Sequence, residues 1–194
     1  MMKILISLCL FFNLTFALPF NAIHSTMEQN IHKSLQILQT SQESTEAIAQ
    51  KIFAIFDDIF DWELMAKLSL SQSYNTLSLD DQKLFNQVFE NNVKKNFTDK
   101  LRLYKNQTFE VLEGTLVQPN RYHLKTSIII DGKVNYIIFK FYPKEQENWK
   151  IYDADVLGIS IIQTYRSQFA DILKRYDFTT LMQKLQSEIT LDIK

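Results

Sequence analysis

The side chains that could perform acid–base chemistry are few. Asp153 and Asp155 stand two residues apart in a predicted strand, so their carboxylates share one face and could act as a general acid–base pair. No histidine or nucleophile lies near them in the sequence, and an exposed face or a contact with a helix terminus explains them better. Ser160 follows Gly158, but its neighbours lack the pattern of a nucleophile elbow and suit a helix N-cap. These residues favour a protein without a catalytic set.

Metal ligands are equally scarce. His24 and His32 are eight residues apart in one predicted helix, which is too far for a shared metal ion, and His123 stands alone in a predicted strand. The only cysteine, Cys9, lies in the apolar segment at the start of the chain. We therefore expect no metal, no disulfide and no cofactor.

The first 17 residues have the three parts of a secretory signal peptide. Lys3 supplies a positive charge, residues 4–16 are mostly apolar, and Thr15 and Ala17 occupy the −3 and −1 positions of a cleavage site. We expect cleavage after Ala17, which would leave residues 18–194 as a single domain outside the cytoplasm. A short membrane anchor is the alternative, but the apolar run is short for a span and Asn13 interrupts it.

Composition excludes several classes of protein. The chain has 21 Lys and Arg against 22 Asp and Glu, which argues against a strongly basic nucleic-acid-binding protein. Hydrophobic residues make up 46% of the 194 residues, so an acidic disordered chain is excluded and a sizeable core can form. With only three glycines, a glycine-rich phosphate loop is not expected.

Hydrophobic periodicity predicts helices first and strands after them. Apolar residues recur every three or four positions, and Ser78 is placed to cap the longest helix. The helices are predicted over 23–38, 48–59 continuing to 68, 79–104, 162–173 and 178–185. The strands, with period two, are predicted over 108–117, 121–130, 134–142 and 148–157, with a hairpin signal at Asp131 and Gly132. The order favours an α+β fold with helices on one face of a curved, four-stranded antiparallel sheet.

Alternation in the third predicted strand separates its two faces. Ile137, Phe139 and Phe141 lie on a uniformly apolar face, whereas the opposite face is mixed and includes Lys140. The apolar face could form solid core under the helices, or it could line a cavity between the helices and the sheet. The pattern leaves both interpretations open.

The end of the predicted sheet carries a family motif. Residues 149–160 read WKIYDADVLGIS and residues 165–169 read YRSQF. These segments resemble the MlaC family of periplasmic phospholipid carriers, also known as toluene-tolerance proteins. Segments 78–89, 103–109 and 178–185 are similar to the family's helix start, helix-to-strand junction and closing helix, although Asp177 stands where the family usually has glycine. The resemblance spans residues 20–190.

The resemblance implies an NTF2-like fold whose sheet and helices enclose an apolar pocket. It also implies a soluble, monomeric periplasmic protein that is not an enzyme. Such a protein shuttles phospholipid between an outer-membrane lipoprotein–porin complex and an inner-membrane ABC transporter with an MCE-domain subunit, and so maintains the lipid asymmetry of the outer membrane. No nucleic acid is involved, and the only bound molecule is the phospholipid cargo.

Carried over by position, the residues expected to contact acyl chains come from the long helix, the third and fourth strands and the start of the next helix. They are Phe97, Leu101, Tyr104, Ile137, Phe139, Phe141, Tyr152, Ile159 and Ile162. Any one of them could instead be ordinary core.

Two other functions stay open at this point. An NTF2-like isomerase or dehydratase would need a titratable side chain in the cavity, for which Asp153 beside Tyr152 is the candidate. A periplasmic chaperone or adaptor that binds apolar peptides would need a shallow apolar groove. An enclosed tunnel would favour the lipid carrier.

Overall fold

The computed structural model describes residues 17–102, 107–130, 132–145, 147–187 and 189–190. The expected signal peptide, apart from Ala17, lies outside the described residues, and so does Tyr104. The elements in chain order are η1 (Phe20–Ala22), α1 (Ile23–Thr40), α2 (Thr45–Phe56), α3 (Trp62–Leu70), η2 (Ser71–Thr76), α4 (Leu79–Leu101), β1 (Phe109–Gln118), β2 (Arg121–Ile130), β3 (Lys133–Glu145), β4 (Asn148–Val156), β5 (Ile159–Ser160), α5 (Ile161–Leu173) and α6 (Phe178–Ser187).

Serine caps fix where three of the helices begin. The hydroxyls of Ser44, Ser78 and Ser160 accept hydrogen bonds from the amide three residues further on, at 3.2, 3.1 and 3.0 Å. These bonds satisfy donors that a helix start leaves unpaired. The cap expected at Ser78 is confirmed, and α4 follows it from Leu79 to Leu101.

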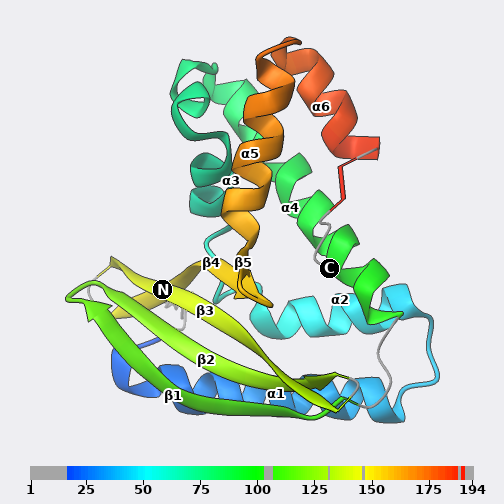
Figure 1. Cartoon of the computed structure of the whole chain (residues 1–194), viewed down its shortest axis with the longest axis vertical. Helices are drawn as coiled ribbons and strands as arrows, with labels where there is room; N and C mark the ends of the chain where they lie inside the picture. Colours follow the sequence, from blue (N-terminus) through cyan, green and yellow to red (C-terminus); the bar gives the residue numbers. More distant parts are fainter. Residues whose placement is uncertain (1–16, 103–106, 131, 146, 188, 191–194) are drawn as a thin grey trace, which may run out of the picture.

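The sheet is antiparallel, in the order β1-β2-β3-β4-β5, so the expectation of four strands is wrong by one (Figure 1). After β4, Leu157 and Gly158 both have positive φ, at 54° and 83°, and they turn the chain back on itself. Ile159 and Ser160 then pair with Val156 and Asp155. A strand of two residues has too little alternation to be detected in a sequence, which explains the error.

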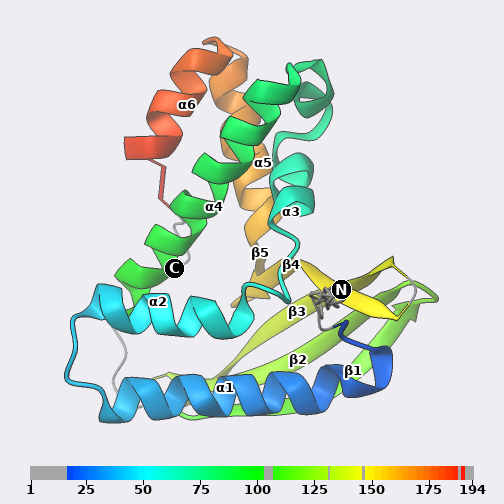
Figure 2. The ribbon, with the colours of Figure 1, turned by 180° about the vertical axis from the view of Figure 1, so that it is seen from behind.

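The helices do not form a single layer on the sheet. Ile23 and Met27 of α1 pack on the apolar face of the sheet, against Leu124 and Phe141. The second core joins α3, η2, α4, α5 and α6, and its largest fully buried side chains include Phe85 and Phe169. Figures 1 and 2 show this helical bundle standing beyond the sheet, with α1 alongside the strands.

A short segment before α3 connects the two cores. The amide of Ile151 in β4 donates to the carbonyl of Ile59 at 2.8 Å, and the amide of Asp61 donates to the carbonyl of Ile151 at 2.9 Å. Phe60, which stands between Ile59 and Asp61 in the sequence, packs against both cores. Its ring stacks on Trp62 with centroids 4.7 Å apart. The free edge of β4 is thereby covered by backbone that leads directly into the bundle.

Candidate functional site

The apolar face of the sheet is buried at one end and partly exposed at the other. Along β3, Phe141 is fully buried, whereas Phe139 and Ile137, which lie nearer the hairpin that joins β2 and β3, are half-buried. The neighbouring strand β2 repeats the gradient, from the fully buried Leu124 to the half-buried Ile128. Apolar side chains at the hairpin end are therefore accessible from outside.

Cross-strand pairing shows that these accessible side chains share one face. Ile137 is paired with Val156, which is in turn paired with Ile159, and paired residues in adjacent strands point to the same side. Ile159 is 38% exposed. We call this set of Ile128, Ile137, Phe139, Val156 and Ile159 the open apolar face.

Thr126 introduces a polar group into the open apolar face. Its Cα is paired with that of Ile137, its side chain is 1% exposed, and its hydroxyl has no hydrogen-bond partner in the described structure. Leaving a buried hydroxyl unpaired costs about 1–3 kcal/mol. Protein atoms cover this oxygen, so the unpaired hydroxyl is a cost to the fold and not a contact for a bound molecule.

Helix α2 connects this region to α4. Phe56 packs against the sheet core, and Phe53 contacts Phe97 of α4 edge-to-face, with ring centroids 5.2 Å apart. Phe97 is 39% exposed and Leu101, one turn further, is half-buried. A cavity of about 510 Å³ opens between α2 and α4, and Phe53 is among its lining residues together with Lys94, Lys95 and Arg102. A second cavity of about 510 Å³ lies between α5 and α6 and includes Ile172, Tyr176 and Ile189.

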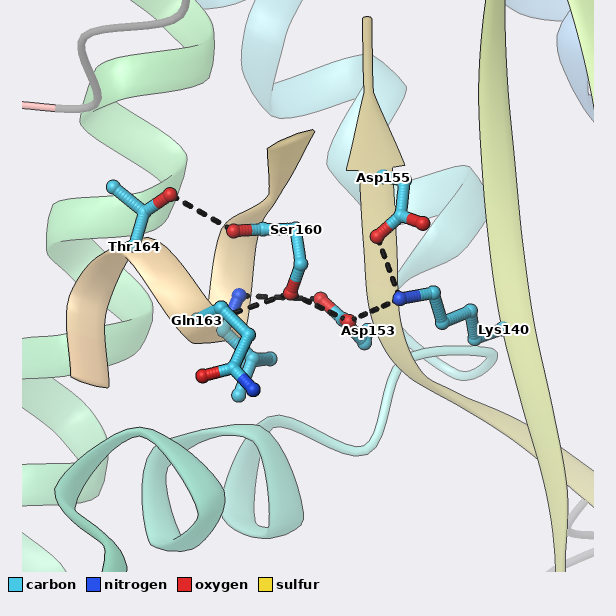
Figure 3. A network of polar contacts seen from close by, with 7 residues as sticks. Lys140, Asp153, Asp155, Ser160, Gln163 and Thr164 are labelled. Carbon is cyan, nitrogen blue, oxygen red and sulfur yellow. Dashed lines mark hydrogen bonds and ion pairs between the residues drawn. The ribbon is translucent and has the colours of Figure 1, made fainter. Parts of the chain in front are cut away.

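The family motif forms a polar clamp between the sheet and α5 (Figure 3). Asp153 is 5% exposed, and its Oδ2 accepts from Lys140 Nζ at 2.9 Å and from Ser160 Oγ at 2.8 Å. Its Oδ1 accepts from the amide of Ile162 at 3.1 Å, in the first turn of α5. A carboxylate at a helix N-terminus is also favoured by the helix dipole. The clamp therefore fixes the start of α5 on β4.

Lys140 forms ion pairs with both Asp153 and Asp155, which leaves the group of three with a net charge of −1. Its Nζ lies 2.9 Å from an oxygen of Asp153 and 2.6 Å from an oxygen of Asp155. Burial disfavours its charge, but the hydrogen bonds to Asp155 and Asp153 outweigh burial and raise the pKa of Lys140 above its usual value. The expectation that the two carboxylates share a face is confirmed, and the oxygens of Asp153 are occupied by structural partners.

A second buried carboxylate holds the segment before α3. Asp61 is 4% exposed and accepts from the amide of Leu64 at 3.1 Å, from Lys144 Nζ at 3.1 Å and from the hydroxyl of Tyr142. Burial acts to raise the pKa of Asp61, but these hydrogen bonds and the charge of Lys144 together hold it below its usual value.

The residues expected from the sequence to contact acyl chains are distributed over several environments. Ile137, Phe139 and Ile159 belong to the open apolar face, and Phe97 and Leu101 lie near the end of α4. Phe141 and Ile162 are buried, the first in the sheet core and the second in the bundle core.

Tyr152 lies on the opposite face of the sheet. The pairing of β3 with β4 has an extra residue in β4 at this point, because Lys140 pairs with Asp153 while Phe141 pairs with Ile151. The bulge directs Tyr152 to the outer face, where its ring meets Tyr142 with centroids 5.9 Å apart and Arg121 lies 5.2 Å from its centroid.

Sequence reasoning did not place three residues of this region, Ile128, Val156 and Thr126, although two features of the sequence locate Ile128. The hairpin signal at Asp131 and Gly132 fixes the register of β2 against β3, and alternation then places Ile128 on the face of Ile137. Val156 follows Asp155 and alternation therefore places it on the opposite face, because the bulge in β4 comes before Asp153.

Within the described ranges, no cluster of three or more His, Cys, Asp or Glu side chains could hold a metal ion. None of the helices in those ranges is both long enough and apolar enough to cross a membrane.

Comparison with known proteins identifies one family and a structural relative. The model of the MlaC protein family matches residues 28–187. A search of curated protein sequences finds no significant match. A solved structure that resembles the chain is the phospholipid-binding protein from Ralstonia solanacearum in complex with a phospholipid, with a TM-score of 0.71 and 18% sequence identity. The alignment covers 84% of this chain and 93% of the Ralstonia chain.

Proposed function

The chain belongs to the MlaC family, and on that premise we propose that it binds a phospholipid and carries it as cargo. The observation that carries the proposal is the open apolar face, where Ile137, Phe139 and Ile159 stay accessible although their neighbours are buried. In the described residues this face is open and is not the enclosed tunnel expected from the sequence, so the family match decides for a lipid over an apolar peptide. The Ralstonia protein of similar fold was solved with a phospholipid bound, which supports the same class of ligand here.

The physics of acyl chains gives such a carrier its purpose. Exposing a methylene group to water costs about 0.8 kcal/mol, so two acyl chains of ordinary length cost on the order of 20 kcal/mol. Spontaneous crossing of an aqueous gap is therefore very slow. A protein that covers the chains with apolar side chains removes most of this barrier, and it needs no catalytic residue to do so.

In this proposal the acyl chains lie on the open apolar face, and the sheet and helices form an NTF2-like frame around them. Phe97 and Leu101 complete the contacts from α4. Phe141 and Ile162 support the site from the two cores rather than touch the lipid. Tyr152 lies on the outer face of the sheet, away from the proposed lipid site.

The proposal includes a place in the cell. Export by the signal peptide brings residues 18–194 to the periplasm as a monomer. There it passes phospholipid between an outer-membrane lipoprotein–porin complex and an inner-membrane ABC transporter with an MCE-domain subunit. Outer-membrane lipid asymmetry is maintained as a result.

The test is to purify the mature protein without detergent and to measure bound phospholipid by native mass spectrometry and lipid extraction. We expect phospholipid with the native protein and none with Phe139→Asp, because a carboxylate among acyl chains costs several kcal/mol or draws water in. Phe139 is only half-buried, so the variant should still fold, which circular dichroism checks.

Val134→Asp is the matched control. It places the same charge on the opposite face of β3, where Val134 is 57% exposed and is paired with Ile129. We expect it to carry lipid as the native protein does. A folded Phe139→Asp variant with its full lipid content would contradict the proposed site, and a native protein without phospholipid would contradict the function.

A further inference from the structure

The open apolar face changes its polarity toward the β2–β3 hairpin. Asn135 is paired with Ile128, which belongs to that face, so its side chain lies on the same side of the sheet. Lys133 is paired with Ile130 and stands two residues before Asn135 in β3, so alternation places it on this side as well. From the buried Phe141 to the hairpin, the face is therefore first apolar, then carries an amide, and ends with an ammonium group.

The Lys133 ammonium has no opposite charge beside it in the part of the chain that the structure describes. The side chain is exposed, and it forms no ion pair with a described residue. The described residues that are paired across this face from Thr126 to the hairpin include no carboxylate. Arg102, at the end of α4, is by contrast engaged by Glu46 and Asp99. Lys133 is thus a cation that the face offers to a ligand.

Asn135 separates this ammonium group from the apolar side chains. It is half-buried, and its Nδ2 donates to the carbonyl oxygen of Lys133 at 3.1 Å. In a phospholipid, ester groups likewise stand between the phosphate and the acyl chains. The order of polarity along β3 therefore matches the order of polarity along the lipid.

The spacing along β3 matches the lipid as well. A strand rises about 3.4 Å per residue, so Phe139 lies roughly 14 Å from Asn135, and Lys133 lies roughly 7 Å from Asn135 in the other direction. The acyl layer of one leaflet is about 15 Å deep, half of the bilayer core. Phe141, which is fully buried, closes the far end. The apolar stretch thus has about the length of an acyl chain and ends where the polar side chains begin.

We propose that Lys133 binds the phosphate of the carried phospholipid and that Asn135 lies at the level of its ester groups. This inference rests on the proposed function and adds the orientation of the lipid, with the head group at the β2–β3 hairpin and the acyl chains toward Phe139. Lysine acts as a point charge without a fixed fork of donors, so it recognises the phosphate and not the group attached to it. Phosphatidylglycerol and phosphatidylethanolamine should bind alike, and diacylglycerol, which lacks the phosphate, should bind more weakly.

The experiment incubates the mature protein with vesicles that contain phosphatidylglycerol and diacylglycerol with the same acyl chains. The vesicles are removed, and the ratio of the two lipids extracted from the protein is measured by mass spectrometry. We expect the native protein to prefer phosphatidylglycerol and Lys133→Gln to lower this preference about fivefold at low salt, as for an exposed ion pair. The difference should shrink as salt is added. Uptake of diacylglycerol should not change, whereas a purely structural role of Lys133 would alter both lipids.

Two further variants control for charge elsewhere. Lys125→Gln removes a lysine of the neighbouring strand that is paired with Ile138 on the opposite face, and it should keep the native ratio. The turn of the hairpin contains one acid, Asp131, which lies outside the described residues. Lys133→Gln is therefore also measured in an Asp131→Asn background, where we expect the same loss of preference.

Inorganic phosphate tests a second source of the same anion. In excess over the lipid, it should leave both the lipid ratio and the melting temperature unchanged, because a free ion lacks the acyl contacts and an exposed lysine alone holds it weakly. A lipid ratio that fell with inorganic phosphate as it does in Lys133→Gln would mean that the lysine binds free anions, and this would overturn the assignment to a lipid head group.

The remaining outcomes separate this inference from the proposed function. A native protein that carries phospholipid without preferring it to diacylglycerol overturns the inference and leaves the function intact, whereas a native protein that takes up neither lipid contradicts the function itself. The inference is also overturned if Lys133→Gln keeps the native ratio, if it loses both lipids equally, or if its effect disappears in the Asp131→Asn background. A loss confined to phosphatidylglycerol in both backgrounds supports it.

Discussion

Replacing Asp153 by alanine should destabilise the protein by about 4 kcal/mol. The carboxylate is 5% exposed and accepts three hydrogen bonds, one from the Lys140 ammonium, one from the Ser160 hydroxyl and one from the Ile162 amide. A hydrogen bond to a charged group contributes about 1.5–3 kcal/mol, and a buried donor left without its acceptor costs about 1–3 kcal/mol. Lys140 keeps Asp155 as a partner at 2.6 Å, which limits the loss.

The more conservative replacement Asp153→Asn should destabilise the protein less than Asp153→Ala does. Its amide oxygen can still accept from the Ile162 amide, but its NH₂ group cannot accept from Lys140 or Ser160. We expect a loss of about 2–3 kcal/mol for this variant.

Urea unfolding followed by circular dichroism measures these losses as changes in the free energy of unfolding. The control is Asp171→Ala, because Asp171 is an exposed carboxylate that pairs with Lys174 at 3.0 Å and should contribute less than about 1 kcal/mol. If Asp153→Ala cost no more than Asp171→Ala, the clamp would not hold α5 on the sheet and our reasoning about the family motif would be wrong.

Two further predictions concern pH and the start of the mature chain. Because folding lowers the pKa of Asp61, the stability that this carboxylate contributes is present above its unfolded pKa and is lost as pH falls through its folded pKa. The native protein should therefore be more stable than Asp61→Asn at neutral pH. Urea titrations should show the difference in free energy of unfolding shrinking below about pH 4. A difference that did not change with pH would count against this. Intact-mass measurement of the exported protein should give a chain that begins at Leu18. The Leu18 nitrogen donates to Asn148 Oδ1 at 3.3 Å, and its carbonyl accepts from the Trp149 amide at 2.8 Å. A mass that includes residues 1–17 would contradict cleavage after Ala17.

The local features of the fold were available in the sequence. The cap at Ser78, the long helix behind it and the hairpin signal between β2 and β3 all depend on residues within a few positions of one another. The common face of Ile137, Phe139 and Phe141 is also confirmed, because alternation in an uninterrupted strand follows from backbone geometry alone. The family motif was likewise present in the sequence, and the family match bears it out.

Only the tertiary structure decided which apolar residues are core and which stay accessible. Phe141 and Phe139 are two residues apart on one face, yet the first is fully buried and the second is half-buried, because α1 and the segment before α3 cover only part of the sheet. Tyr152 lies on the face opposite to the expected one, because one extra residue in β4 resets the alternation. The strand β5 is too short for its period to be detected in the sequence. The ion pair between Lys140 and Asp153 forms because β3 pairs with β4, which one segment of sequence does not show. Burial and pairing depend on chain segments that are distant in the sequence, whereas periodicity reports only what one segment can offer to them.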